Sequence, residues 1–162
     1  MQIVVRKFID GDEEAFRLLN EEWIVPLFGL EDADRKILGD PQTHILAHAG
    51  QIYMALDGEK RVGTCALVKM GEGEYEVAKM GVSSELRGRG IGRLLLEFIL
   101  ADARKIGAKR LYIESNSTLK SALHLYESVG FQHLPPGQGH PHFARGNIFM
   151  ELWLDEKPRV TP

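Results

Sequence analysis

Alternating hydrophobic and polar positions, together with short apolar runs, predict strands in the first half of the chain. Residues 2–9 alternate, 51–56 and 61–70 are apolar runs, and 74–82 follows as a further predicted strand. The turn Asp57-Gly58-Glu59-Lys60 separates the second strand from the third, and an Asp-Gly turn between two apolar runs is typical of a β-hairpin. Because a second glycine-containing turn follows at 71–73, we expect three consecutive antiparallel strands.

Apolar residues spaced three and four apart predict helices in other segments. The most regular spacing runs from Gly90 to Ile106, and Gly107 is expected to end that helix. The other predicted helices run from a cap at Asp10 or Asp12 to a break at Pro26 and Gly29, from Glu31 to Leu38, and from Leu119 to Val129. Helices therefore follow both the first strand and the central strands.

Three further strands are predicted in the C-terminal half, over residues 109–114, 131–134 and 147–154. The segment 135–141 is rich in Pro and Gly, so it can be neither a helix nor a central strand. This order of elements predicts an α+β, or mixed α/β, fold. We expect a single domain over residues 1–155 and a C-terminal tail over 156–162.

Composition narrows the class of protein. The chain has 162 residues, 44% of them hydrophobic, and a formal net charge of -3. This charge argues against general nucleic-acid binding, which depends on many Lys and Arg side chains neutralising phosphates. Cys65 is the only cysteine, so no intramolecular disulfide can form. Neither a signal peptide nor an apolar run of about 18 residues is recognisable, so we expect a cytoplasmic protein without membrane contact.

A glycine- and arginine-rich loop connects the strand ending at Val82 to the most regular helix. Its glycines are Gly88, Gly90 and Gly92, and its arginines are Arg87, Arg89 and Arg93. Glycines let backbone N–H groups approach an anion closely, and a helix N-terminus favours negative charge. The arginines make a phosphate group, and pyrophosphate in particular, the expected ligand. A tight strand-to-helix connection without a ligand is the alternative interpretation.

Residue types exclude two other phosphate-binding loops. A P-loop ends in Gly-Lys-Ser/Thr, whereas Gly92 is followed by Arg93 and Leu94. A dinucleotide-binding fingerprint counted from Gly88 requires a glycine at position 93, and it follows the first strand of a parallel βαβ unit. Neither condition is met by this sequence.

The loop resembles the acetyl-CoA loop of the GNAT superfamily of N-acetyltransferases. That pattern is Arg or Gln, two residues, Gly, one residue, then Gly or Ala, and Arg87, Gly90 and Gly92 match it. The segment Leu-Tyr-Glu-Ser-Val-Gly-Phe at 125–131 also looks like a family segment. The resemblance implies a twisted, mostly antiparallel sheet of about seven strands, with helices on both faces and a splay between the fourth and fifth strands.

The same resemblance assigns the cofactor-binding residues. The backbone of Met80 and Val82 is expected to bind the pantetheine arm like an added strand, and residues 87–93 the pyrophosphate. Asn116 is similar to a family Asn near the cofactor arm, although a turn-forming role between strand and helix is equally compatible. The full set of predicted cofactor-binding residues is Met80, Gly81, Val82, Arg87, Gly88, Arg89, Gly90, Ile91, Gly92, Arg93 and Asn116.

Two residues are candidate catalytic groups. Glu76 is in register with a carboxylate that some GNAT enzymes use as a general base; a solvated or salt-bridged carboxylate is the alternative. Regular strand alternation would place it on one face with Met80, and Lys79 on the other. Tyr126 is similar to the family Tyr that approaches the thioester sulfur, where it would stabilise the thiolate; a core aromatic residue is the alternative. The backbone N–H of Val82 or a neighbour is expected to meet the carbonyl oxygen.

These assignments predict an N-acetyltransferase that passes an acetyl group from acetyl-CoA to an amine of a small molecule, peptide or protein. The alternatives are a non-catalytic acyl-CoA sensor or partner module, or a transferase that uses another acyl-CoA. Acceptor specificity is expected from residues 21–32 and 135–145. We expect no metal, because His44 and His48 and the pair at 140–142 lack the usual partner ligands and are interpreted as loop residues. A homodimer is left open.

Overall fold

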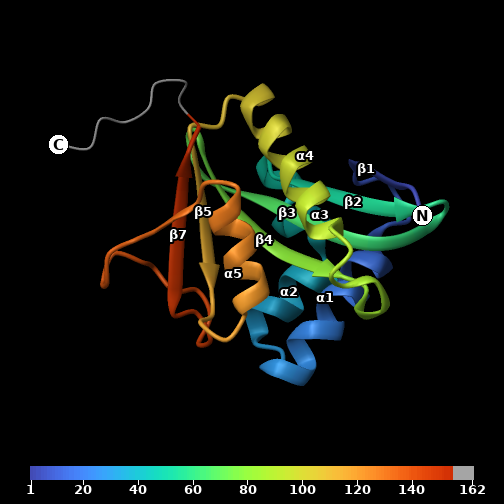
Figure 1. Ribbon diagram of the computed structural model, residues 1–162, viewed down its shortest axis with the longest axis horizontal. Helices are drawn as coiled ribbons and strands as arrows, with labels where there is room; N and C mark the ends of the chain where they lie inside the picture. Colours follow the sequence, from blue (N-terminus) through green and yellow to red (C-terminus); the bar gives the residue numbers. More distant parts are fainter. Residues whose placement is uncertain (155–162) are drawn as a thin grey trace.

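The computed structural model describes residues 1–154, which form a sheet with helices on both faces (Figure 1). The strands are β1 (Ile3–Lys7), β2 (Gln51–Asp57), β3 (Lys60–Gly71), β4 (Glu74–Val82), β5 (Arg110–Ser115), β6 (Gln132–His133) and β7 (Ile148–Trp153). The helices are α1 (Glu13–Leu27), α2 (Asp32–Gly39), α3 (Pro41–His44), α4 (Ile91–Lys105) and α5 (Lys120–Ser128), with 3-10 turns η1 (Leu46–His48) and η2 (Ser84–Leu86). Within this described range, no helix is long and apolar enough to cross a membrane. The expected domain boundary at 155 and the tail over 156–162 lie outside the described residues.

A mixed sheet with one parallel pair forms the centre of the molecule. Its strand order is β1-β2-β3-β4-β5-β7-β6, and only β4 and β5 run parallel to each other. The pairs that join β4 to β5 are Glu74 with Arg110, Tyr75 with Leu111, and Glu76 with Tyr112. Beyond these pairs the two strands separate, which confirms the predicted splay between the fourth and fifth strands.

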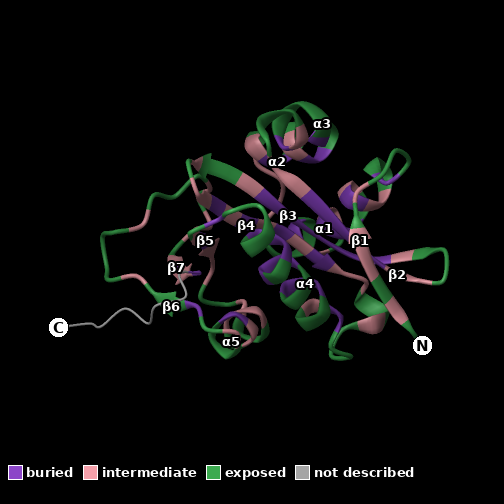
Figure 2. Ribbon diagram, turned by 90° about the horizontal axis from the view of Figure 1, so that it is seen from above, coloured by how far each residue is buried: buried purple, intermediate pink, exposed green. Residues whose placement is uncertain are grey.

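Two apolar clusters, one on each face of the sheet, hold the helices in place. Figure 2 shows α4 and α5 on one side of the sheet and α2 and α3 on the other. On the first side, Leu95 of α4 packs in one cluster with Val77 of β4. On the second side, Phe16 of α1 packs with Ala66 of β3. Burying a large apolar side chain contributes roughly 1.5–3 kcal/mol, so these clusters carry much of the stability of the fold.

A β-bulge in β4 changes which side chains share a face. The register between β3 and β4 shifts near Lys79, whose backbone is left-handed with a φ of 54°. Lys79 therefore reaches Asp34 on α2, whereas Met80 packs against the cluster under α4. The extra residue of a bulge reverses the alternation that follows it. The expectation that Glu76 and Met80 share a face, with Lys79 opposite, is therefore wrong.

Two expectations about α1 are also corrected. Pro26 lies inside the last turn, and the helix continues through Leu27. The turn can close around the proline because the N–H of Phe28 still reaches the carbonyl oxygen of Ile24 at 2.8 Å. Asp12 occupies the N-cap position but makes no side-chain cap hydrogen bond, since its buried carboxylate pairs with arginines of β1 and β3.

The segment around His44 and His48 contains more helix than its sequence predicts. Pro41 begins the short helix α3, and the carboxylate of Asp40 accepts the N–H of Thr43 as a cap. The turn η1 follows directly. Proline at a first helical position and Asp at an N-cap are favourable, so a four-residue helix forms where we expected a loop.

Candidate active site

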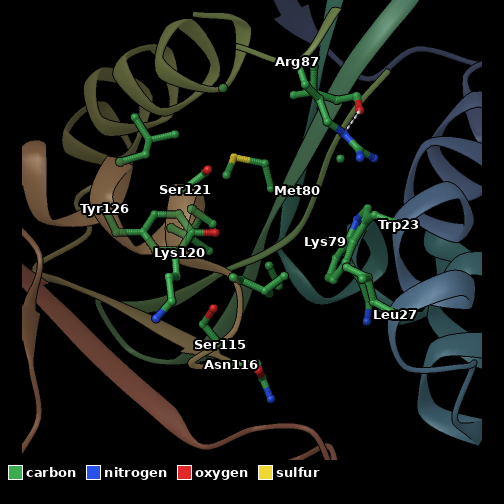
Figure 3. A pocket seen from close by; sticks show the side chains of 18 of the residues that line it. Trp23, Leu27, Lys79, Met80, Arg87, Ser115, Asn116, Lys120, Ser121 and Tyr126 are labelled. Atoms are coloured by element: carbon green, nitrogen blue, oxygen red, sulfur yellow. Dashed lines mark hydrogen bonds between the residues drawn. The ribbon is translucent and has the colours of Figure 1, made fainter. Parts of the chain in front are cut away.

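A cleft of about 650 Å³ opens where β4 and β5 separate (Figure 3). It is lined by α1, the second half of β4, the glycine loop with the start of α4, the end of β5, α5, and the β6–β7 loop at residues 134–147. Every predicted site residue except Arg89 lines this cleft. The predicted anion-binding loop and both catalytic candidates therefore share one cavity.

The glycine loop has a backbone that glycine favours. Gly88 and Gly90 are left-handed, with φ of 79° and 83°, and no atom of the described residues lies within 4 Å of a Cβ added to either. Gly90 is the N-cap of α4 and provides no side-chain cap to the first turn. The first N–H groups of a helix lack intrahelical partners, so those at the start of α4 can bind an anion.

The three loop arginines differ in their contacts. Arg87 donates from Nε to the carbonyl oxygen of Val82 at 3.4 Å, as Figure 3 shows, and also lies 3.8 Å from a carboxylate oxygen of Glu22. Arg93 donates to the hydroxyl of Ser128 at 2.8 Å. Arg89 does not line the cleft, so its predicted contact with phosphate has no support from this geometry.

The segment Met80 to Val82 forms one wall of the cleft after the bulge. Because β4 and β5 pair only up to Glu76, the later part of β4 has an edge that faces the cleft. Gly81 sits tightly against α1, where a Cβ would collide with the carbonyl oxygen of Leu19. An extended ligand arm could bind such an edge as an additional strand does, and this role for the segment stays a prediction.

Tyr126 projects from α5 toward the cleft (Figure 3). Its side chain packs edge-on against Phe131, with ring centroids 6.1 Å apart. Within the described part of the chain, its hydroxyl makes no hydrogen bond. Burial raises the pKa of this phenol, so it stays protonated and can act as a hydrogen-bond donor at neutral pH.

Glu76 lines the cleft from β4 and is poised to exchange a proton near neutral pH. Burial, and next the negative charge of Glu114, raise the pKa of its carboxyl from 4.5 to about 7, while His142 and Lys79 partly offset the effect. A general base works best when its pKa lies near the working pH. The geometry and the pKa of Glu76 are therefore compatible with its predicted role.

Glu114, at the end of β5, lies beside Glu76 and anchors the β6–β7 loop. Its two oxygens accept the backbone N–H groups of His142, at 2.9 Å, and Phe143, at 3.0 Å. Potential metal-ligand atoms of Glu76, Glu114 and His142 lie within 4.8 Å of one another. Carboxylate and imidazole groups are ligand types that can hold a cation. The hydrogen bonds of Glu114 already account for its position, and the absence of a metal stays an expectation.

Asn116 lies at the turn between β5 and α5 and also lines the cleft. Its side-chain oxygen accepts the N–H of Thr118 at 2.8 Å, and its side-chain nitrogen donates to the carbonyl oxygen of Arg145 at 2.8 Å. The turn-forming interpretation thus describes its contacts, and the predicted cofactor contact stays a prediction.

Several residues that the fold brings to the cleft were not predicted from the sequence as site residues. Lys79 and Glu114 are charged residues within predicted strands of the sheet, where charged side chains are uncommon, and this could have marked them as candidates. Phe143 and Arg145 come from the β6–β7 loop, which was expected to influence acceptor choice but without named residues. No sequence signal connects Arg145 to Asp34, which lies 111 residues earlier.

Comparison with other proteins relates this chain to N-acetyltransferases. The chain is 38% identical over 96 residues to the N-alpha-acetyltransferase RimI of Mycobacterium tuberculosis. It is 30% identical over 99 residues to the uncharacterized N-acetyltransferase YjgM of Escherichia coli. Each match covers 59% of this chain. The matched region spans 56% of RimI and 59% of YjgM, which is somewhat more than half of each relative.

Solved structures and a family comparison agree on the fold. A GNAT-family acetyltransferase from Staphylococcus aureus superposes with a TM-score of 0.85 at 20% identity, covering 95% of this chain and 100% of that chain. The putative acetyltransferase YncA of Salmonella typhimurium, solved with acetyl-CoA, superposes with a TM-score of 0.76 at 17% identity. The superposition covers 96% of this chain and 95% of that chain. Residues 13–131 match the Acetyltransferase (GNAT) family, and the chain therefore belongs to the GNAT family of acetyltransferases.

Proposed function

We propose that the protein transfers an acetyl group from acetyl-CoA to a primary amine by direct attack in a ternary complex. The observation that carries this proposal is that one cleft joins the loop at the start of α4 to Glu76 and Tyr126. A donor bound at the loop and an amine entering from the side of α1 would meet where β4 and β5 separate. A cytoplasmic location is part of the proposal and is supported by a single, unpaired cysteine.

The donor half of the cleft suits a pyrophosphate and an extended arm. Gly88 and Gly90 expose backbone beside the start of α4, and Arg87 and Arg93 add positive charge there. The arm would follow the edge of β4 at Met80 to Val82. This arrangement would bring the thioester to the region between β4 and Tyr126.

Glu76 is the proposed general base. The bound ammonium first loses a proton to solvent, and the neutral amine nitrogen then attacks the thioester carbonyl carbon. The carbon–sulfur bond breaks, the thiolate leaves, and the second proton of the nitrogen passes to the Glu76 carboxylate, directly or through water. The charged and titratable groups that face Glu76 are Glu114 and Tyr112 of β5, His142 of the β6–β7 loop, and Lys79 of β4. Burial together with Glu114 keeps its proton affinity suited to this exchange at neutral pH.

Tyr126 is the proposed hydrogen-bond donor to the departing thiolate. A thiol with a pKa near 8.5 is more acidic than a phenol with a pKa near 10, and burial raises the pKa of Tyr126 further. Complete proton transfer from Tyr126 to the thiolate would therefore be uphill. A hydrogen bond that stabilises the thiolate needs no such transfer, and the hydroxyl has no competing partner among residues 1–154.

The acceptor half of the cleft favours a cationic amine attached to an apolar group. Lys79 and Arg145 are both paired with Asp34, so among residues 1–154 no Lys or Arg forms an ion pair with Glu114 or Glu76. The charge of Glu114 and the ionised form of Glu76 can therefore attract a cationic amine. Apolar walls come from Trp23, Leu27 and Phe143. Among amines, the α-amine of a peptide or protein is one class supported by the similarity to a protein named N-alpha-acetyltransferase.

A panel of amines tests the proposal. Purified protein is mixed with acetyl-CoA and small amines, peptides with free N-termini or peptides with a free lysine, and both thiol release and product mass are followed. We expect amine-dependent thiol release for at least one class. Binding of acetyl-CoA without turnover of any amine would favour the non-catalytic sensor, and faster reaction with a longer acyl-CoA would favour a different donor.

A further inference from the structure

A buried ion cluster lies behind the acceptor side of the cleft. The carboxylate of Asp34 on α2 is fully buried and accepts a hydrogen bond from Nζ of Lys79 at 2.5 Å. Two guanidinium nitrogens of Arg145 bond to the same carboxylate, each at 2.8 Å. Burial alone would raise the pKa of Asp34, but the bonds from Arg145 and Lys79 hold that pKa well below its usual range. Asp34 is therefore a carboxylate at any pH near neutrality.

The cluster joins three elements that are far apart in sequence: α2, the bulge of β4 and the β6–β7 loop. Glu31 strengthens the connection to the loop, accepting the N–H of Ala144 at 3.0 Å and a nitrogen of Arg145 at 3.3 Å. Phe143 lies within the cluster, with Lys79 Nζ and Arg145 Cζ each 4.2 Å from its ring centroid. Two cations at this distance fix the ring by cation–π attraction.

The opposite side of the β6–β7 loop is held by β5. Glu114 accepts the N–H groups of His142 and Phe143, and the hydroxyl of Tyr112 accepts the N–H of His140 at 3.2 Å. The loop thus spans the opening between β4 and β5, with anchors on β5 at one side and on α2 at the other. Phe143 and Arg145 line the cleft from this position.

We propose that Asp34 is a positioning residue for the acceptor amine. It does not line the cleft, but it holds Phe143 and the β6–β7 loop where they form the acceptor wall. Without the Asp34 charge, Lys79 and Arg145 would remain as two buried cations close to the same ring, and their repulsion would displace the loop. The inference rests on the proposed acetyl transfer, because it assigns a role in binding the amine.

Steady-state kinetics of Asp34→Asn test the proposal, with Asp32→Asn as a matched control on the same helix. Asp32 is 93% exposed, and its one ion pair within residues 1–154 is with Arg35 one turn away. We expect the KM for the amine to rise about tenfold to a hundredfold in Asp34→Asn, because a shift of about 1 Å in a positioning wall has effects of this size. The KM for acetyl-CoA should rise much less than the KM for the amine, since the pyrophosphate loop at 87–93 contacts neither Asp34 nor its partners Lys79 and Arg145.

Limited digestion with trypsin provides a readout that does not depend on turnover. The bond after Arg145 lies in the β6–β7 loop and is protected by the contacts of Arg145, whose side chain is only 11% exposed. In Asp34→Asn we expect cleavage at this bond to accelerate about tenfold, detected by the mass of the fragments, with no change in Asp32→Asn. If Asp34→Asn fails to fold, Arg145→Lys carries the test, because it keeps the charge and the cleavage site but loses the paired hydrogen bonds.

The possible outcomes separate this inference from the proposed function. An unchanged KM for the amine and unchanged cleavage in folded Asp34→Asn would overturn the inference. A parallel rise in both KM values would also overturn it, because it would indicate a general structural defect. If even the unmodified protein acetylates no amine, the proposed function fails and the acceptor role of Asp34 fails with it, while the trypsin result still decides whether Asp34 holds the loop.

Discussion

Replacing Glu76 with Gln is expected to change stability and activity in opposite directions above neutral pH. The pKa of Glu76 is raised from 4.5 to about 7, so the protonated form is the one that the fold favours. Its contribution to stability is complete below pH 4.5 and is lost as the pH rises through about 7. The shift corresponds to roughly 3 kcal/mol, which is the cost of an ionised Glu76 in the folded protein at high pH.

Gln cannot ionise, so Glu76→Gln avoids this cost. The stability difference is the free energy of unfolding of Glu76→Gln minus that of the unmodified protein. We expect this difference to increase by roughly 2 kcal/mol between pH 5 and pH 8. Activity should change in the opposite sense, so that the unmodified protein is the more active of the two at pH 8. About a tenth of Glu76 is deprotonated at pH 6 and about nine tenths at pH 8, so kcat of the unmodified protein should rise roughly tenfold across this interval. In the variant, kcat should be at least about a hundredfold lower and should lack this rise.

The assay combines denaturant unfolding at both pH values with kcat from pH 5.5 to 8.5. Both substrates are kept saturating, because the ionisation of the amine itself, with a pKa near 10, would impose a slope on kcat/KM. Glu74→Gln is the matched control, since Glu74 is on the same strand but its side chain is 44% exposed. A kcat profile in Glu76→Gln that still rises with a midpoint near 7 would refute the assignment of the base, and a stability difference independent of pH would refute the raised pKa.

Three other substitutions test separate parts of the site. Gly90→Asp should weaken acetyl-CoA binding by about tenfold or more in calorimetry, because it adds negative charge at the start of α4 and strains a left-handed residue; Gly90→Ala separates strain from charge. Tyr126→Phe should lower kcat about tenfold with an unchanged Kd for acetyl-CoA, and unchanged turnover would contradict its role. Glu114→Gln should move the midpoint of the kcat profile below 7, because it removes a charge that raises the pKa of Glu76; an unmoved midpoint would leave burial as the whole cause.

Local patterns were enough to predict most of the fold. The spacing of Leu95 and Ile99 with their neighbours predicts α4, and the Asp57-Gly58 turn predicts the β2–β3 hairpin, because both signals lie within a few residues of chain. The glycine loop was predictable for the same reason. Each of these features is determined by neighbouring residues, so a single sequence contains the information.

The acceptor half of the cleft was not predictable, because long-range contacts form it. The bulge at Lys79 depends on how β4 packs against β3 and α2, and it reverses the alternation expected for the strand. Pairing of Asp34 with Arg145 needs α2 and the β6–β7 loop, which are far apart in sequence, to come into direct contact. The sequence predicts a regular strand over 74–82, a helix over 31–38 and an irregular segment over 135–141, but the charges in these segments acquire partners only in the folded chain.

The short contact between β4 and β5 also relates the stability of the protein to the supply of its substrate. Only three residue pairs join the two strands in the sheet, so the edge of β4 beyond Glu76 is open to a ligand that binds as a strand does. A ligand that binds only the folded chain adds about 2.7 kcal/mol to its stability at a hundred times Kd. If acetyl-CoA occupies this edge, cells rich in acetyl-CoA retain more of the folded protein, and depletion of the donor lowers its abundance as well as its rate.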